Sequence, residues 1–397
     1  MRVCVLTTGR QDWGILTWVA RAIVESPRLT LVLVAGGMHF RDGAGPRVLD
    51  GLPVDDVVDS LQASDSPRAV AQSAGWTTAL LAPVLARQDV ELLVLAGDRT
   101  ETLAAAVAAT CMRVPILHLH GGEESLGAID NACRHAITRL AQYHAVAHER
   151  FASRLEGWGE RPDRVYVTGA PGLDVTRCLT PLDPAALARS LGRDRLGTPL
   201  VILTHHPTTL GEESPASEIA AVLEGVRRAV AGRPDALVVM TAANADTGGG
   251  TINTALRSAA AADPHRFLLV ESLGAQRYHS LLALADVMVG NSSSGILEAP
   301  TYDLPVVNVG DRQRGRLRVG RVTDVPVDAE AVERAVRAET AAAGAGEPRA
   351  PRPARTTPYG DGRAAPRLLA VLHAIADEPA PRRLVKEHAP APLDAQG

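Results

Sequence analysis

Short apolar runs that end in glycine-rich polar residues constrain the fold of this chain more than any other feature. Residues 92–96 are one such run, and it ends in Gly97, Asp98 and Arg99. Apolar runs of about five residues are typical of strands buried on both faces, as in parallel sheets. Helical patterns separate these runs, and this alternation of strands and helices predicts a doubly wound parallel sheet.

The alternation occurs twice along the chain. Because 397 residues are too many for one ordinary core, two domains are expected. Prolines and glycines punctuate residues 178–198, where we place the crossover between the domains. The prediction is therefore an α/β protein with two doubly wound parallel-sheet (Rossmann-like) domains, at 1–180 and 198–340. The predicted strands lie at 3–6, 31–35, 92–96, 114–118, 144–147 and 165–167, and at 200–204, 236–241, 267–270, 287–289 and 305–309.

The C-terminal part of the chain has a different composition. Residues 341–356 are rich in Ala, Gly, Pro and Arg, which predicts a flexible insertion. Residues 357–376 are expected to end in a helix, from 366 to 376, that packs back on the domains. Several prolines in 377–397 predict a disordered tail.

Composition excludes several classes of function. The net charge is −4 and the only lysine is Lys386, so no basic surface for nucleic acid or anionic membrane is expected. The four cysteines form no C-x-x-C pair, which argues against a zinc ribbon or a thioredoxin-type site. No run of eighteen apolar residues occurs. Together these features indicate a cytoplasmic protein with free thiols.

Two strand ends in the first half carry candidate catalytic residues. Asp98 follows the strand at 92–96, where it could act in chemistry or simply cap the next helix. His118 ends the strand at 114–118, and His120 follows it. Since alternate strand residues point the same way, this pair could hold a divalent metal, form hydrogen bonds with a sugar, or pack as a structural pair.

The expected helix at 129–140 carries Asp130 and Arg134 on one face, because they are four residues apart. A surface ion pair worth a few tenths of a kcal/mol is the simple alternative. The helix directly follows a loop containing Gly121, Gly122 and Glu123, and this loop favours a functional site.

Two turns are candidate anion sites. Gly9 and Arg10 follow the first strand, where backbone N–H groups and a guanidinium could meet an anion, although a tight turn with a surface arginine explains them equally well. In the second half, residues 290–298 lead from a strand through three serines into a helix, whose N-terminus would present free N–H groups. The serines could also be simple cap residues.

Six motifs in a fixed order resemble the UDP-N-acetylglucosamine 2-epimerase family, and most closely its hydrolysing branch. The resemblance extends over about residues 3–375. The motifs are Gly97-Asp98-Arg99-x-Glu101, His118-x-His120-Gly121-Gly122-Glu123, Asp130 with Arg134-His135-Ala136-Ile137-Thr138, His206-Pro207-Thr208-Thr209, Gly290-Asn291-Ser292-Ser293-Ser294-Gly295 and Gly310-Asp311-Arg312-Gln313-x-Gly315-Arg316.

The resemblance implies the two-domain glycosyltransferase-B architecture, with the active site in the interdomain cleft. It implies that Arg10, His206, Ser292 and Ser293 bind a diphosphate and that Glu298 binds the ribose. The groups expected to act in catalysis are Asp98, Glu123, Asp130, Arg134, His118, His120 and His206. The groups expected to bind the nucleotide sugar are Arg10, Asp12, His39, Arg99, His206, Asn291, Ser292, Ser293, Gly295, Glu298, Arg312 and Arg316.

The activity implied is that of a hydrolysing UDP-N-acetylglucosamine 2-epimerase that needs neither a cofactor nor a metal. Departure of UDP would acidify the hydrogen at C2, a carboxylate would remove it, and water would add to the resulting 2-acetamidoglycal to give N-acetylmannosamine. Another UDP- or GDP-acetamido sugar as substrate, a non-hydrolysing epimerase, and a glycosyltransferase are the alternatives. A homodimer or homotetramer is expected.

Two positions depart from the family's pattern. Non-hydrolysing relatives place a glutamate where this chain has His120, so Asp98 is the expected base at C2, with Asp130 or Glu123 assisting water. Trp13 stands where relatives differ, and it is expected to alter the sugar pocket.

Overall fold

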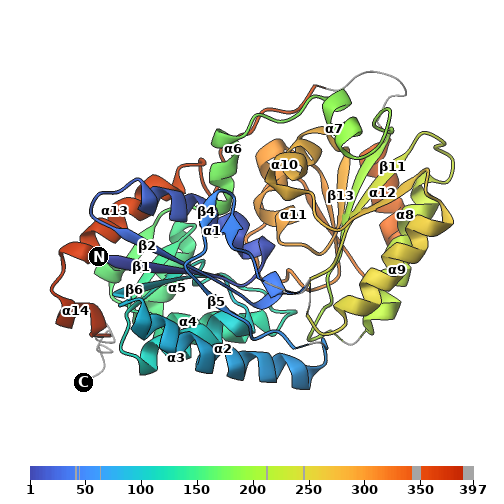
Figure 1. Ribbon diagram of the computed structural model, residues 1–397. Helices are drawn as coiled ribbons and strands as arrows, with labels where there is room; N and C mark the ends of the chain where they lie inside the picture. Colours follow the sequence, from blue (N-terminus) through green and yellow to red (C-terminus); the bar gives the residue numbers. More distant parts are fainter. Residues whose placement is uncertain are drawn as a thin grey trace, which may run out of the picture. The chain divides into compact units, whose positions relative to one another are not determined.

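Two parallel sheets, each built from alternating strands and helices, make up the chain (Figure 1). The structure is a computed structural model that describes residues 1–40, 43, 45–62, 64–211, 213–244, 246–341 and 350–387. Unit 1 comprises Met1–Glu123, Asp130–Asp174 and the described residues from Tyr359 onward, and unit 2 comprises Glu124–Ile129 and Val175–Pro358. The predicted α/β class with two Rossmann-like sheets is confirmed.

The sheet of unit 1 has seven parallel strands in the described part of the chain, in the order β5-β2-β1-β6-β7-β8-β9. The chain adds β2 and β5 on one side of β1 and then adds β6 to β9 on the other side. The reversal point of the sheet therefore lies between β1 and β6. The strands are β1 (Arg2–Thr7), β2 (Thr30–Gly36), β5 (Asp56–Val58), β6 (Leu92–Ala96), β7 (Ile116–Leu119), β8 (Tyr143–Val146) and β9 (Val165–Val167).

Alternate strand residues of unit 1 pack under two layers of helices. One face lies under α1 and α13, and the opposite face lies under α2, α3 and α4 (Figure 1). α2 is also, by length and composition alone, the one described helix that could cross a membrane, but here its Leu81, Val84 and Leu85 pack on the sheet. The helices are α1 (Arg10–Val24), η1 (Gly37–Phe40), α2 (Pro67–Arg87), α3 (Thr100–Cys111), α4 (Asp130–Leu140), α5 (Glu149–Gly157), η2 (Pro162–Arg164), η3 (Pro171–Asp174), α13 (Ala364–Asp377) and α14 (Ala380–Leu384).

Unit 2 repeats this plan with six described parallel strands in the order β12-β11-β10-β13-β14-β15. Helices α8, α9 and α12 cover one face, and α7 and α10 cover the other. The strands are β10 (Leu200–Thr204), β11 (Leu237–Thr241), β12 (Phe267–Val270), β13 (Val287–Gly290), β14 (Val306–Val309) and β15 (Val322–Val325). The helices are α6 (Val175–Cys178), α7 (Pro184–Ser190), α8 (Pro215–Val230), α9 (Gly249–Ala262), α10 (Gly274–Leu284), α11 (Ser294–Leu297), η4 (Ala299–Tyr302) and α12 (Ala329–Thr340).

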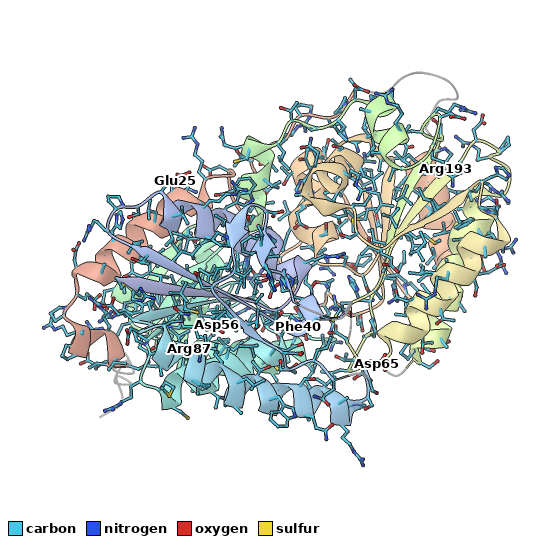
Figure 2. The ribbon with its side chains drawn as sticks, viewed as in Figure 1. Glu25, Phe40, Asp56, Asp65, Arg87 and Arg193 are labelled. Atoms are coloured by element: carbon cyan, nitrogen blue, oxygen red, sulfur yellow. The ribbon has the colours of Figure 1, made fainter. Side chains whose placement is uncertain are left out.

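The strands that sequence patterns do not reveal lie at sheet edges. β5 and β15 contain polar, partly exposed residues because only one neighbour covers them. The guanidinium of Arg87, the last residue of α2, lies 2.6 Å from the Asp56 carboxylate and ties β5 to that helix (Figure 2). The short hairpin of β3 (Val48–Leu49) and β4 (Leu52–Pro53) was also not predicted.

The segment predicted to be a flexible insertion is held in place over part of its length. The Arg352 N–H donates to the Ala283 carbonyl at 3.0 Å, and the Arg355 N–H donates to the Thr301 carbonyl at 2.7 Å. These backbone hydrogen bonds attach residues 350–356 to α10 and η4, and flexibility of the insertion stays a prediction. Residues 342–349 of the predicted insertion lie outside the described residues.

The tail after α13 also makes contacts within unit 1. Helix α14 forms, and Arg383 donates to the Ala376 and Glu378 carbonyls at 3.0 Å each. Up to residue 387 the tail therefore has a described structure, and disorder of the tail stays a prediction. Residues 388–397 of that tail lie outside the described residues.

Helix α13 belongs to unit 1 although it follows unit 2 in the chain. The Asp174 carboxylate accepts hydrogen bonds from the N–H groups of Ala364 and Ala365, at 2.8 and 2.6 Å, and so caps the first turn of this helix. The buried residues Leu368, Leu372 and Ile375 then pack on the core under α1. The predicted helix at 366–376 is therefore present, with bounds two residues earlier and one later.

Candidate functional site

The strand order places candidate residues at the reversal point of each sheet. In unit 1, β1 and β6 are neighbours on opposite sides of this point, and in unit 2 the corresponding strands are β10 and β13. Loops at the carboxyl ends of such strands diverge and leave space for a ligand. The predicted groups of each unit come from these loops and from the strand next to them, and each unit is described by itself.

Arg134 organises the candidate site of unit 1. This residue of α4 is 1% exposed, and its guanidinium pairs with the Asp98 carboxylate at the end of β6. It also donates to the Glu123 carbonyl oxygen at 3.0 Å. A planar guanidinium with several fixed donors holds both groups in one orientation. The structure therefore brings Asp98, Glu123 and Arg134 together.

His120 and Glu123 form a buried pair beside that arrangement. The Nδ1–H of His120 donates to Oε1 of Glu123 at 2.7 Å, and the two side chains are almost entirely buried. His120 has φ +64°, a left-handed conformation that is uncommon outside glycine. Its Nε2 has no hydrogen-bond partner within the described residues. Since Glu123 fixes the tautomer, Nε2 is the atom that can exchange a proton with a ligand.

The turn after His120 depends on a glycine. Gly122 has φ +75°, and a Cβ there would lie 2.8 Å from the Phe151 carbonyl oxygen. Arg154 of α5 donates to the Gly122 carbonyl at 2.6 Å and holds the turn from the other side. The loop is therefore packed tightly against α5, with no room for a larger residue at position 122. This packing places Glu123 beside His120.

His118 is buried, and both its ring nitrogens are hydrogen-bonded within unit 1. It is 0% exposed; its Nε2–H donates to the Gly97 carbonyl at 2.8 Å, and its Nδ1 accepts from the Thr138 hydroxyl at 3.1 Å. Burial lowers the pKa of His118 to about 3, so the ring is neutral. One nitrogen thus holds the Gly97 carbonyl before Asp98 and the other contacts Thr138 of α4, while an action of His118 on the sugar stays a prediction. In the described part of the chain, no three His, Cys, Asp or Glu side chains converge as metal ligands.

Asp130 and Arg99 lie at helix starts in the same unit. Asp130 is the first residue of α4 and is half-buried. Arg99 directs its guanidinium to Glu101 at 3.5 Å. Burial acts to raise the pKa of Glu101, but Arg99 and nearby hydrogen bonds lower it overall. Arg99 is thus engaged with the buried Glu101, a residue whose supporting role we did not predict although it lies in the first motif.

Asp12 is part of the scaffold of the turn after β1. Its carboxylate accepts from the N–H groups of Thr8 and Gly9, at 2.7 and 2.8 Å, and from the Thr7 and Thr8 hydroxyls. These four hydrogen bonds use its acceptor capacity within the protein, and binding of substrate by Asp12 stays a prediction. It caps α1, whose first residue is the exposed Arg10.

Two aromatic residues near the start of α1, His39 and Trp13, have different surroundings. His39 is half-buried, and its Nε2 lies 3.0 Å from the Thr7 hydroxyl, at the carboxyl end of β1. Trp13 packs in the core under α1, and its indole N–H donates to Asp50 at 2.7 Å. The Trp13 ring therefore faces the core, and its expected effect on the sugar pocket stays a prediction.

Asn291 organises the candidate site of unit 2. It is fully buried at the end of β13, accepts from the His206 N–H at 2.7 Å and donates to the His206 carbonyl at 2.8 Å. The His206 ring is held from the other side, since its Nδ1 accepts from the Asn244 N–H at 3.2 Å. Asn291 therefore acts by joining two loops, and its amide is already used within the protein.

Gly290 makes this junction possible. It has φ +128°, and a Cβ at this position would lie 2.0 Å from the Thr204 carbonyl oxygen. We expect Gly290→Ala to reduce the free energy of unfolding by at least about 3 kcal/mol, because neither backbone can move without breaking the parallel pairing of β10 and β13. Urea denaturation checks this value.

Gly232→Ala is the matched control, since a Cβ there meets nothing within 4 Å. It should change stability by no more than about 1 kcal/mol. A Gly290→Ala protein with the urea midpoint of the unmodified chain would contradict the packing argument.

The serine turn has a different form from the one predicted. The helix that follows, α11, has only four residues and continues as the 3-10 turn η4, so a long helix dipole is not available. Ser292 and Ser293 are half-buried, and the Ser292 hydroxyl accepts from the Ser294 N–H at 3.3 Å. Gly295 is buried, where a Cβ would lie 2.9 Å from Val306. Gly295 therefore allows close packing against Val306, and its assignment as a ligand-binding residue stays a prediction.

The basic loop after β14 lies against the same turn. Gln313 donates to the Asn291 carbonyl at 2.9 Å, and Arg312 is 3.4 Å from that oxygen and 3.7 Å from the Asp246 carboxylate. Arg316 and Glu298 are both half-buried in unit 2. Asn244, Asp246 and Gln313 were not predicted; the polar residues that follow the strand at 236–241 are the signal that could have revealed the first two.

Comparison with known proteins agrees with this arrangement. The family model described as UDP-N-acetylglucosamine 2-epimerase matches residues 21–373. The chain belongs to the UDP-N-acetylglucosamine 2-epimerase family. It is 31% identical over 330 residues to the GDP/UDP-N,N'-diacetylbacillosamine 2-epimerase (hydrolyzing) of Campylobacter jejuni, in an alignment that covers 82% of this chain and 85% of that protein.

Two further relatives support the family and its fold. The UDP-N,N'-diacetylbacillosamine 2-epimerase (hydrolyzing) of Legionella pneumophila is 30% identical, covering 94% of this chain and 96% of that protein. A crystal structure of the UDP-N-acetylglucosamine 2-epimerase of Neisseria meningitidis has a TM-score of 0.74 at 16% identity, covering 94% of this chain and 100% of that one. The predicted family and the glycosyltransferase-B class of the fold are confirmed.

Proposed function

We propose that this member of the 2-epimerase family is a hydrolysing enzyme that converts a UDP-linked 2-acetamido sugar into UDP and the free C2-epimer. The observation that carries the proposal is the buried cluster of unit 1, in which Arg134 holds Asp98 and the Glu123 backbone while Glu123 orients His120. Carboxylates and an oriented imidazole next to one another are what proton removal and hydration at adjacent carbons require.

Unit 2 would bind the nucleotide. The turn of Ser292 and Ser293, His206 and the basic loop of Arg312 and Arg316 supply hydroxyl, imidazole and guanidinium groups at the carboxyl ends of β10, β13 and β14. Such donors disperse the charge that develops on a departing diphosphate. Glu298 is proposed to bind the ribose. Breakage of the C1–O bond would then give C1 oxocarbenium character and acidify the hydrogen at C2.

Proton transfer is assigned to unit 1. Asp98 would remove the hydrogen from C2, forming a 2-acetamidoglycal, with Arg134 directing its carboxylate. Water would then add across the double bond, and the His120–Glu123 pair or Asp130 would assist that addition. Each positioned acid or base is typically worth about 10²–10⁴-fold in rate.

For the sugar, we propose a 2-acetamido hexose with N,N'-diacetylbacillosamine favoured over N-acetylglucosamine. The relatives from Campylobacter jejuni and Legionella pneumophila, at 31% and 30% identity, are both named for the diacetylated sugar and as hydrolysing enzymes. A relative from Neisseria meningitidis, at 29% identity, is named for UDP-N-acetylglucosamine. The two substrates differ at C4 and C6, positions remote from the bonds that react.

The test is NMR of the protein with each UDP-sugar in D₂O. We expect free UDP and a free sugar that is inverted and deuterated at C2. Epimerised sugar still attached to UDP would instead identify a non-hydrolysing epimerase. Intact substrate that reacts only when an acceptor is added would identify a glycosyltransferase.

Ser293→Ala should weaken UDP binding about ten- to a hundredfold, because loss of one hydrogen bond to a charged group costs roughly 1.5 to 3 kcal/mol. Titration calorimetry with UDP measures the change. Ser258→Ala, which removes an exposed hydroxyl from α9 in the same unit, is the matched control and should leave affinity unchanged. Equal affinities for UDP in the two variants would remove Ser293 from the proposed site.

A further inference from the structure

Lys386 occupies an unusual position in the part of the tail that the sequence predicts to be disordered. It is the only lysine in a chain whose lysines and arginines together number 41. Its ammonium donates to the Thr138 carbonyl at 3.0 Å, to the Ala141 carbonyl and to the Glu160 carboxylate at 2.8 Å. All three donors of the ammonium are therefore used within unit 1.

The Thr138 carbonyl lies in the last turn of α4, and Ala141 directly follows the last residue of that helix, Leu140. The last carbonyls of a helix have no partner within it and attract a cation through the helix dipole. Lys386 supplies that cation at the opposite end of α4 from Asp130. A guanidinium directs its donors only within its own plane, whereas an ammonium directs three donors outward from one atom, which favours lysine at this position.

Glu160 ties this contact to the core of unit 1. It is 2% exposed and accepts from the Nε2–H of the fully buried His144 at 3.0 Å. Arg139 approaches its other oxygen at 3.3 Å. Burial acts to raise the pKa of Glu160, but the hydrogen bonds from His144 and Lys386 lower it to about 2, so it is ionised. A buried carboxylate of this kind depends on its cationic partner.

A short series of contacts leads from Lys386 to the candidate catalytic groups. The Thr138 carbonyl is bound by Lys386, and the Thr138 hydroxyl donates to His118. His118 in turn donates to the Gly97 carbonyl, immediately before Asp98. The same helix carries Arg134, the partner of Asp98, one turn before Thr138. Both members of the Asp98–Arg134 pair are thus supported from the end of α4 that Lys386 holds.

We propose that Lys386 is a positioning residue: by fixing the C-terminal end of α4 it sets the geometry of the Asp98–Arg134 pair for proton transfer. Only the expected effect on kcat rests on the proposed function. The structural part, the attachment of the tail to α4, is independent of the substrate.

Lys386→Met, which nearly keeps the length of the side chain but removes its charge, should lower kcat about ten- to a hundredfold, as small misplacements of reacting groups do. KM and UDP affinity should stay near those of the unmodified protein, because unit 2 is untouched. The matched control is Glu387→Gln. Glu387 is the residue after Lys386, and this substitution breaks only its exposed ion pair with Arg161. It should retain full turnover.

Amide hydrogen exchange supplies a readout that does not need activity. In Lys386→Met the N–H groups at the C-terminal end of α4 should exchange faster, while those of β10 and β13 should not change. If the unmodified protein turns over no UDP-sugar, the proposed function is wrong. Amide exchange in α4 still tests whether Lys386 holds the end of that helix. Unchanged exchange in α4, or a kcat within about twofold of the unmodified protein, would overturn the inference.

Lys386→Arg keeps the charge, and it tests the same proposal if Lys386→Met does not fold. It should fold and show a smaller loss of kcat, because a guanidinium directs its donors only within its own plane. A Lys386→Arg protein with unmodified kcat and exchange would overturn the argument for the lysine.

Discussion

Asp98→Asn should lower kcat by about 10³-fold or more while UDP binding is retained, because the substitution removes the proposed base at C2. Asparagine preserves the size of the side chain and one oxygen for Arg134, so the cluster of unit 1 should remain folded. Steady-state turnover of the UDP-sugar gives kcat, and calorimetry with UDP tests the binding site of unit 2 separately. Release of deuterium from C2-labelled substrate should fall in parallel with kcat.

Asp163→Asn is the matched control for that experiment. Asp163 is an exposed aspartate of the same unit, paired with Arg161 at the surface at 2.9 Å. Its substitution should leave turnover unchanged. If Asp98→Asn turned over substrate at the unmodified rate, Asp98 would have no role in proton transfer, and Asp130 or His120 would become the candidate base.

His120→Gln and Glu123→Gln should each lower kcat about 10²–10⁴-fold, because the pair acts through one proton-exchanging atom, Nε2 of His120. The double variant should be hardly slower than the slower single variant, as is expected when residues work as a unit. Kinetics of the four proteins in a double-mutant cycle measure this coupling.

His265→Gln controls for loss of a histidine at an exposed position of unit 2. It should be as active as the unmodified chain. Losses that multiply in the His120–Glu123 double variant would show that the two residues act independently, and the buried hydrogen bond between them would then be only structural.

His118 and His120 have different environments that their sequence pattern does not predict. They lie two residues apart at one strand end, and alternation alone predicts that they face the same way. The chain turns into a left-handed conformation at His120, so of these two rings only that of His120 keeps a nitrogen without a partner among the described residues. His118 is used to support the Gly97 carbonyl. No pattern of residue types distinguishes these two environments.

Asp12 and Gly295 show the same limit at the two turns. Both lie in motifs typical of ligand-binding loops, yet Asp12 accepts hydrogen bonds at the first turn of α1 and Gly295 packs on Val306. A motif describes the loop as a whole, including residues that only shape it. Contacts decide which members of the motif can meet a ligand.

The sequence by itself determined the alternation of strands and helices, the two sheets, the family, and the strand ends at which polar residues collect. These are local properties, because apolar periodicity and turn residues act over a few neighbours along the chain. The tertiary structure alone decided the edge strands β5 and β15, the attachment of Lys386 to α4, and the different environments of His118 and His120. Each of these depends on contacts between residues far apart in sequence, whose partners no local pattern records.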